Sequence, residues 1–164
     1  MKLRNEIPGD ETAIHELTKT AFAPIEKSDG SEPMIIDRLR KNSDLTLSLV
    51  VLDHNQIVGH IAFSPVTVSE SSGVWFGLGP VSVHPEQQRA GIGRQLVETG
   101  LQRLRSLDAA GCVLLGDPAY YERFGFSSSC DLTFGEVPVE YVLALSFGPE
   151  KAKGEIKYAS AFGG

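Results

Sequence analysis

The chain contains few of the residues from which disulfide frameworks and metal sites are built. Its two cysteines, Cys112 and Cys130, are too few and too far apart for a Cys-x-x-Cys site or a disulfide scaffold. The four histidines show no His-Glu-x-x-His spacing, the pattern of a helical zinc site. We therefore expect no metal dependence, and we expect Cys112 to pack as a small apolar residue.

Long apolar runs and an excess of positive charge are also absent. No run approaches the roughly 20 apolar residues that a membrane-spanning helix needs, and residues 1–22 mix charged with apolar side chains. A formal net charge of −6 disfavours nucleic acid and anionic membranes as partners, and it favours the approach of a cationic amine. We expect a cytoplasmic protein with neither kind of partner.

Size and patterning favour one compact domain over residues 1–164, of which 41% are hydrophobic. Turn residues and apolar spacing predict a mixture of helices and strands. In order, these are a strand at 2–4, helices after Asp10 and Ser31, a β-hairpin over 45–63, a strand at 75–83, a helix from about Arg89 that Gly111 closes, a buried parallel strand at 112–115, a helix from Pro118 to Gly125, and a strand at 139–147. The residues after Pro149 stay unplaced.

The strand residues 81–83 lead into a turn that carries Gly91 and Gly93 and opens a helix. Glycine lets backbone approach a ligand where a Cβ atom would collide, and the free N–H groups of a helix's first turn point toward an anion bound there. The turn lacks both the Gly-x-Gly-x-x-Gly spacing of a dinucleotide fingerprint and the Gly-Lys-Ser/Thr of a P-loop. It predicts an anion site that fits a pyrophosphate.

The pattern Gln88-x-x-Gly91-x-Gly93 resembles the Arg/Gln-x-x-Gly-x-Gly/Ala signature of the GNAT superfamily, the acyl-CoA-dependent N-acyltransferases. A second stretch, Ala-Tyr-Tyr-Glu-Arg-Phe-Gly-Phe at 119–126, resembles the family's Tyr-Glu-Lys/Arg-x-Gly-Phe motif. Two motifs in this order make the resemblance specific. It is clearest from about Leu45 to Phe126.

The resemblance implies an α/β (α+β) fold with a mixed, mostly antiparallel central sheet, flanked by helices and splayed between its fourth and fifth strands. The co-substrate would be acetyl-CoA, whose pantetheine arm would lie in the splay like an extra strand. Gly77, Gly79 and Pro80 interrupt the strand at 75–83 and predict a bulge or break there. The cofactor-binding residues implied are Val81, Ser82, Val83, Gln88, Arg89, Ala90, Gly91, Ile92, Gly93, Arg94 and Phe124.

Most phosphate contacts implied by the resemblance come from backbone N–H groups of residues 89–94. Arg89 and Arg94 add positive charge within an acidic chain, although either could instead pair with Glu86 or Glu98. Ser82 could hydrogen-bond the substrate, but a strand serine more often faces outward.

The catalytic acid implied by the resemblance is Tyr121, whose hydroxyl would lie near the cofactor sulfur and protonate the departing thiolate. The alternative is an amphipathic core tyrosine. The base is less clear, because positions 74–83 contain no acidic residue where many relatives carry a glutamate. We expect His84 to be a solvent-exposed strand-end residue and Asp117 to cap the next helix, so a water chain or an amine deprotonated in bulk could serve.

The sequence thus predicts an N-acetyltransferase that passes an acetyl or short acyl group from acetyl-CoA to a primary amine of a small molecule or protein by direct attack. The alternative is a non-catalytic acyl-CoA sensor or interaction module, since the cofactor signature is strong and the base is missing. A third reading, an unrelated nucleotide-binding α/β protein, depends only on the glycine turn. A homodimer through the final strands is compatible with the sequence, but no residue argues for it.

Overall fold

The computed structural model describes residues 1–128 and 131–163, so Cys130 lies outside the described residues. They form two compact units, Met1–Phe63 with Gly79–Gly100 and Ser64–Leu78 with Leu101–Gly164. We call these the first and second units. The chain passes between them within β3 (Gln56–Val68), within α3 (Ile92–Ser106) and within β4 (Trp75–Val83).

The sheet of the first unit is antiparallel where its register is defined. β1 (Lys2–Asn5) pairs with β2 (Leu47–Asp53), which pairs with β3 from Gln56 to Phe63. His54 and Asn55 link these two strands with φ of 51° and 64°. Two consecutive residues with positive φ form the type of turn whose twist matches a hairpin. The predicted hairpin is confirmed.

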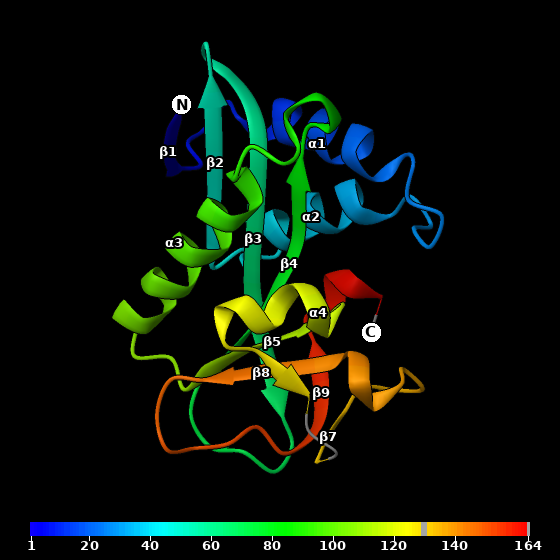
Figure 1. Ribbon diagram of the computed structural model, residues 1–164, viewed down its shortest axis with the longest axis vertical. Helices are drawn as coiled ribbons and strands as arrows, with labels where there is room; N and C mark the ends of the chain where they lie inside the picture. The colour runs from blue at the N-terminus through cyan, green and yellow to red at the C-terminus, as the bar shows by residue number, and fades with distance from the viewer. Residues whose placement is uncertain (129–130, 164) are drawn as a thin grey trace. The chain divides into compact units, whose positions relative to one another are not determined.

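Helices lie on both faces of this sheet (Figure 1). Ile14 of α1 (Glu11–Phe22) and Ile36 of α2 (Glu32–Lys41) pack against Val50 of β2. On β3, the residue next to the one that pairs with Val50 is Gly59, where an added Cβ would lie 2.6 Å from Ile92 Cγ2 at the start of α3. Successive strand residues face opposite sides. The start of α3 therefore packs closely on the face that α1 and α2 do not cover.

Helix α3 is shorter at both ends than the sequence predicts. It begins at Ile92 rather than near Arg89, because Arg89 and Gly91 have φ of 69° and 82°, which a helix does not allow. It ends at Ser106, so the prediction that Gly111 closes it is wrong. Gly111 is the first residue of β5, and an added Cβ there would collide with the Leu145 carbonyl oxygen and the Trp75 ring.

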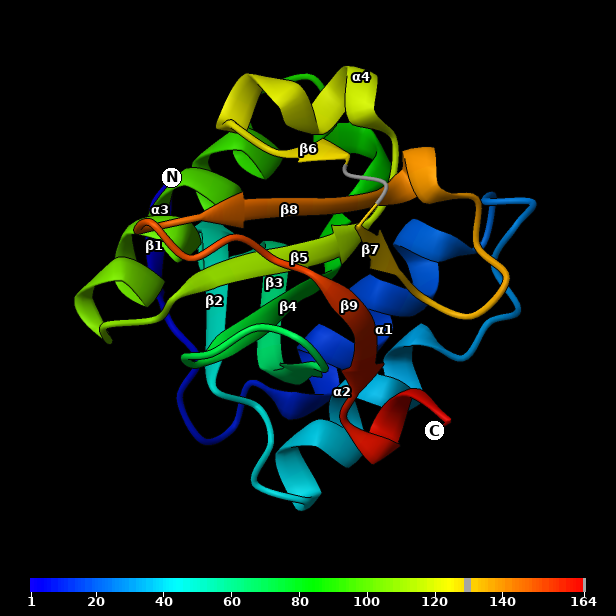
Figure 2. The same ribbon diagram turned by 90° about the horizontal axis from the view of Figure 1, so that it is seen from below.

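The second unit contains mixed strand pairings (Figure 2). β5 (Gly111–Leu115) runs parallel to β4 and antiparallel to β8 (Val142–Ser146), which also pairs with β6 (Ser127–Ser128). β9 (Gly154–Tyr158) pairs with the end of β3 and lies parallel to β7 (Leu132–Thr133). Buried side chains from several of these strands form one cluster: Val66, Val68, Trp75, Val113, Leu132, Val142, Ala152 and Ile156.

Two elements of the second unit differ from the prediction. The strand expected at 139–147 begins only at Val142, because Val139–Tyr141 form a 3₁₀ turn. The unplaced tail contains β9, of which only Ile156 is buried, so it carries little apolar signal. The helix predicted from Pro118 is present as α4 (Pro118–Tyr121) followed by a 3₁₀ turn, and Gly125 ends it with φ of 97°.

The predicted mixed sheet with flanking helices is confirmed. The ladder between β4 and β5 covers three residue pairs, from Trp75 with Gly111 to Gly77 with Val113, and β4 then continues to Val83. Gly79, with φ of 130°, marks the predicted irregularity of β4. None of the helices in the described part of the chain is long and apolar enough to cross a membrane.

Candidate functional site

The turn after β4 has the open backbone geometry that an anion site requires. A 3₁₀ turn, Pro85–Gln87, follows the strand, and His84 Nδ1 accepts a hydrogen bond from the Glu86 N–H at 3.2 Å. Gly91 reverses the chain with φ of 82°, and an added Cβ there would meet no atom within 4 Å. The first intrahelical bond of α3 runs from Gln95 N to Gly91 O, so the N–H groups before it have no acceptor within the helix.

The charged side chains around this turn are exposed. The Arg94 guanidinium forms an i,i+4 pair with Glu98 at 2.5 Å, and Gln88 Nε2 donates to the Val83 carbonyl oxygen at 3.4 Å. Of the two pairings left open for Arg94, the structure shows the one with Glu98. An open glycine, helix N–H groups without an intrahelical acceptor and an exposed arginine together fit the phosphate groups of a nucleotide.

Ser82 differs from the expectation of an outward-facing serine. It is 1% exposed, and its Oγ is one of three buried side-chain polar atoms without a hydrogen-bond partner among the described residues. Val81 and Val83, on either side of it, are half-buried. The side chain of Ser82 therefore points into the molecule.

The second motif lies in the second unit. Asp117 caps α4, since its Oδ1 accepts from the Ala119 N–H at 2.9 Å, as predicted. The Tyr121 ring packs against Phe124 and Phe126, with centroids 6.2 Å and 6.0 Å apart. Burial, with a smaller contribution from Tyr120, raises the pKa of Tyr121 to about 12. The phenol is therefore protonated throughout the neutral range, as a proton donor must be.

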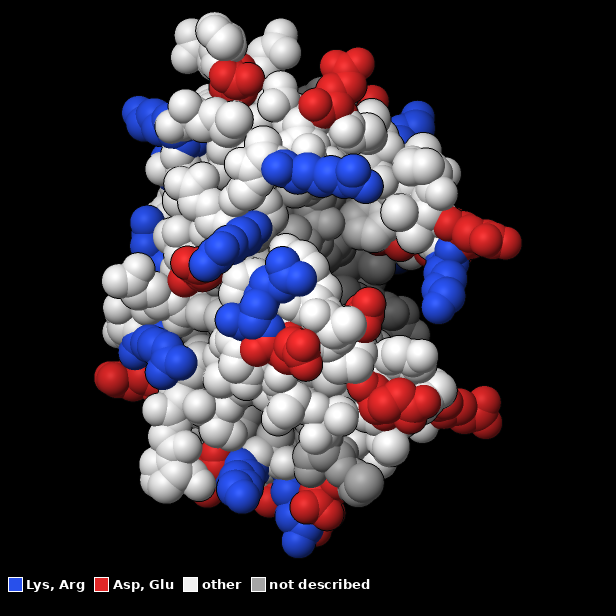
Figure 3. All heavy atoms as spheres, viewed as in Figure 1, with Lys and Arg blue, Asp and Glu red and all other residues white. Residues whose placement is uncertain are grey.

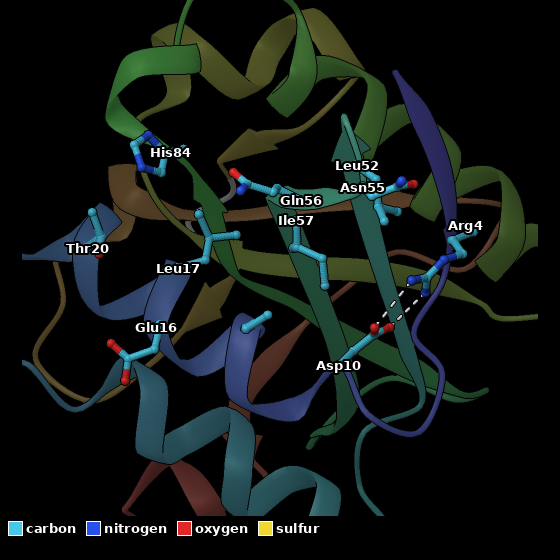
Figure 4. A pocket seen from close by; sticks show the side chains of 11 residues that line it. Arg4, Asp10, Glu16, Leu17, Thr20, Leu52, Asn55, Gln56, Ile57 and His84 are labelled. Carbon is cyan, nitrogen blue, oxygen red and sulfur yellow. Dashed lines mark hydrogen bonds and ion pairs between the residues drawn. The ribbon is translucent and has the colours of Figure 1, made fainter.

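The first unit contains an open cavity of about 490 Å³ between α1 and the β2–β3 turn. On one side of this cavity Arg4 and Asp10 form an ion pair at 2.7 Å. His84 lies on the opposite side (Figure 4). The hydrogen bond from Arg4 outweighs burial and holds the pKa of Asp10 below its usual value. Glu16 of α1 adds a second carboxylate. His84 is half-buried, not fully exposed as expected.

Comparison with known proteins decides the family. Residues 12–126 match the model of the acetyltransferase (GNAT) family. The chain belongs to this family. The prediction of a GNAT acyltransferase is thereby confirmed. The matched residues include both of the motifs that carry the resemblance.

Relatives of this GNAT chain are found among both sequences and solved structures. It is 41% identical over 127 residues to the uncharacterized N-acetyltransferase YhbS of Escherichia coli K12, covering 77% of this chain and 73% of YhbS. A GNAT acetyltransferase of Brucella melitensis, solved with acetyl-CoA, is 44% identical, with a TM-score of 0.88 over 98% of this chain and 97% of that one. The structure of E. coli YhbS with CoA is 33% identical, with a TM-score of 0.89 over 99% and 92%.

The predicted site residues of this GNAT chain fall into two groups. Val81–Val83 and Gln88–Arg94 lie in the first unit, and Tyr121 and Phe124 in the second. Sequence reasoning missed a third group, the hydrogen-bonded residues Glu6, Ser48 and His60, of which Ser48 and His60 are buried and Glu6 is half-buried. Their one signal is a histidine within the otherwise apolar residues 57–63 of β3. No cluster of three or more potential metal ligands occurs in residues 1–128 and 131–163.

Proposed function

We propose that this protein transfers an acetyl group from acetyl-CoA to a primary amine of a small molecule or protein by direct attack. The observation that carries the proposal is the strand, the open glycine turn and the helix N-terminus at 81–94, in a chain of the acetyltransferase family. Relatives of this chain were solved with acetyl-CoA or CoA. The whole chain, residues 1–164, acts as one GNAT domain.

The phosphate groups of acetyl-CoA bind the N–H groups of residues 89–94, with Arg89 and Arg94 adding positive charge. The backbone of residues 81–83 binds the pantetheine arm, and Gln88 and Phe124 complete the cofactor site. Tyr121 protonates the departing thiolate, for which its raised pKa keeps the proton available. The acetyl carbon then passes from sulfur to nitrogen without a covalent enzyme intermediate.

The acceptor is a cationic amine in solution, drawn by the formal charge of −6. Acidic and basic side chains are both distributed over the face seen in Figure 3. The cavity in the first unit supplies the Glu16 carboxylate, to which an ammonium group can bind. We place the protein in the cytoplasm, with no nucleic-acid or membrane partner. A homodimer is the alternative to a monomer, and light scattering separates the two.

The first test is calorimetric titration with acetyl-CoA, followed in the same sample by thiol-release assays over a panel of amines. Saturable binding with thiol release for some amine supports the transferase. Binding without release by any amine supports the sensor alternative, which the absence of an acidic residue at 74–83 favours. A protein that does not bind acetyl-CoA contradicts both. Preferential binding of a nicotinamide or adenine nucleotide would instead favour the unrelated nucleotide-binding protein.

A further inference from the structure

The turn that we propose binds the phosphate groups is attached to β3 at both of its ends. We call residues 84–91 the turn segment. At its start, the His84 N–H donates to the Val58 carbonyl oxygen at 2.8 Å. Just after its end, Ile92 is buried, and its Cγ2 lies 2.6 Å from the position of a Cβ added to Gly59. The residues between these two contacts are exposed, with one exception.

The exception is Gln87, which is half-buried and whose side chain reaches a different strand. Its Nε2 donates to Asp53 Oδ2 at 3.3 Å. Asp53 is the last residue of β2 and precedes Gln87 by 34 positions. By contrast, the side-chain hydrogen bonds of His84 and Gln88 span only two and five positions of the chain. The contact with Asp53 therefore joins the middle of the turn segment to the β2–β3 hairpin.

Asp53 is a suitable anchor because its own backbone is fixed. It pairs with Gln56 in the ladder between β2 and β3. The two residues between them, His54 and Asn55, have φ of 51° and 64°, the geometry of a tight hairpin turn. Asp53 Oδ1 lies 3.0 Å from His54 Nδ1, which leaves Oδ2 to accept from Gln87. A hydrogen bond to a group on a rigid element restrains its partner more than one to a mobile surface group.

The backbone that follows Gln87 needs such a restraint. Gln88 is extended, with ψ of 154°, and Arg89 then has φ of 69°. A residue with a side chain is uncommon at positive φ, and it stays there only where its surroundings hold it. An anion site made of backbone N–H groups also requires that several of them point to one place. A restraint two residues before Arg89 is therefore well placed to set the direction of the N–H groups at 89–94.

We infer that Asp53 and Gln87 are positioning residues for acetyl-CoA, which hold the turn segment in the conformation that binds the phosphate groups. This inference rests on the proposed function, because acetyl-CoA is its ligand. Neither residue touches the cofactor in this role. Asp53 carries charge of the same sign as phosphate, so its electrostatic effect opposes binding. Its contribution to affinity comes from the hydrogen bond to Gln87, and Asp53 lies outside both sequence motifs.

Calorimetric titration with acetyl-CoA provides the first test. Asp53→Ala and Gln87→Ala should each weaken binding by about 5-fold, the effect of one lost hydrogen bond. The double variant should be no weaker than either single one, because all three lack the same contact. Asp53→Asn keeps an oxygen that can accept from Gln87 and removes the charge, so it should bind at least as tightly as the wild type. This variant separates position from charge.

His54→Asn is the matched control. His54 is the partner of the other Asp53 oxygen, its side chain is 94% exposed, and asparagine tolerates the positive φ at this position. Its affinity for acetyl-CoA should stay within about twofold of the wild type. In thiol-release assays, the loss in Asp53→Ala and Gln87→Ala should appear in the KM for acetyl-CoA with kcat nearly unchanged, because the residues act on binding and not on the chemical step.

Limited proteolysis provides a readout that needs no ligand. Trypsin cleaves after arginine, and Arg89 is exposed within the turn segment. Cleavage requires local opening, which the contact between Gln87 and Asp53 opposes. Asp53→Ala and Gln87→Ala should be cleaved after Arg89 at least about fivefold faster than the wild type, and Asp53→Asn at the wild-type rate. Cleavage after Arg123, which is exposed in the second unit, is the internal reference for global unfolding.

The outcomes separate this inference from the proposed function. Asp53→Ala and Gln87→Ala that bind acetyl-CoA within about twofold of the wild type overturn the inference. An equal loss in Asp53→Asn also overturns it, as does equal acceleration of cleavage after Arg89 and Arg123, which would mean global destabilisation. If the wild-type protein does not bind acetyl-CoA, the proposed function fails and the role toward this ligand fails with it, whereas faster cleavage after Arg89 alone would still support the anchoring of the turn segment.

Discussion

The ring of Phe63 occupies the space into which any side chain at Gly100 would project. A Cβ added to Gly100 would overlap the Cε2 and Cζ atoms of that ring. Phe63 is on β3 and fully buried, and Gly100 is in the middle of α3. The absence of a side chain at this one helix position sets how closely α3 approaches the sheet. It therefore also contributes to holding the N-terminus of α3, where we propose that the phosphate groups bind.

Gly100→Ala should destabilise the protein, although alanine is normally the better helix former by about 1 kcal/mol. Overpacking a filled core costs about 1 to 3 kcal/mol, and an aromatic ring has little freedom to move aside. Urea denaturation measures the change. Gly148→Ala is the control, because an added Cβ there meets nothing within 4 Å. Equal stability of the two variants would contradict the packing of Phe63 on α3.

Gly91→Val should weaken acetyl-CoA binding more than Arg89→Ala or Arg94→Ala. Valine at φ of 82° strains the turn and moves the N–H groups that we propose bind phosphate, whereas each arginine substitution removes one exposed charge. We expect a loss of at least about 10-fold in affinity for Gly91→Val, by calorimetry. Gly30→Val carries the same kind of strain at φ of 81° and should bind acetyl-CoA normally. Equal affinities for Gly91→Val and the arginine variants would argue against a backbone anion site.

Tyr121→Phe should lower kcat by about 100-fold and leave acetyl-CoA affinity unchanged. The substitution removes only the hydroxyl that protonates the thiolate, and the ring packing against Phe124 and Phe126 remains. Steady-state thiol release and calorimetry measure the two quantities. Tyr120→Phe is the control on the adjacent residue. If Tyr121→Phe retains wild-type turnover, the tyrosine is a core residue and not the acid.

The His60 pKa predicts how stability depends on pH. The pKa of His60 is 6.5 in the unfolded chain and, because the imidazole is buried, about 4 in the folded protein. As the pH drops, the imidazole therefore binds a proton in the unfolded state before it does so in the folded state. Stability is therefore lost progressively between pH 6.5 and about 4, by about 2 kcal/mol at pH 5. The lowered pKa of Glu6 adds a loss only below its ordinary value of 4.5.

Denaturation at pH 7 and pH 5 checks this prediction. His60→Gln does not titrate, so its stability should fall about 2 kcal/mol less than that of the wild type between these two values. His54→Gln is the control, because the His54 side chain is 94% exposed, and it should keep the wild-type dependence. If the stability of His60→Gln depends on pH as that of the wild type does, His60 is not a buried, neutral imidazole in the folded protein.

Local chemistry was sufficient to predict much of this protein from its sequence. The hairpin turn at His54 and Asn55, the Asp117 cap and the helix end at Gly125 all depend on a few adjacent residues. The two GNAT motifs are equally local, because a glycine turn before a helix binds anions through its own backbone. These motifs identified the family before any contact was known.

Distant pairing decided the rest, and short-range patterns carry no information on it. Gly111 has the pattern of a helix end, but its lack of a side chain is needed to fit Trp75 and Leu145. β9 forms because its backbone pairs with β3 and β7, not because its residues are apolar. Glu6, Ser48 and His60 are far apart in the sequence and are joined by hydrogen bonds only when the first three strands align. The turn that we propose binds the cofactor was thus encoded locally, whereas the hydrogen bonds among Glu6, Ser48 and His60 exist only through the register of the sheet.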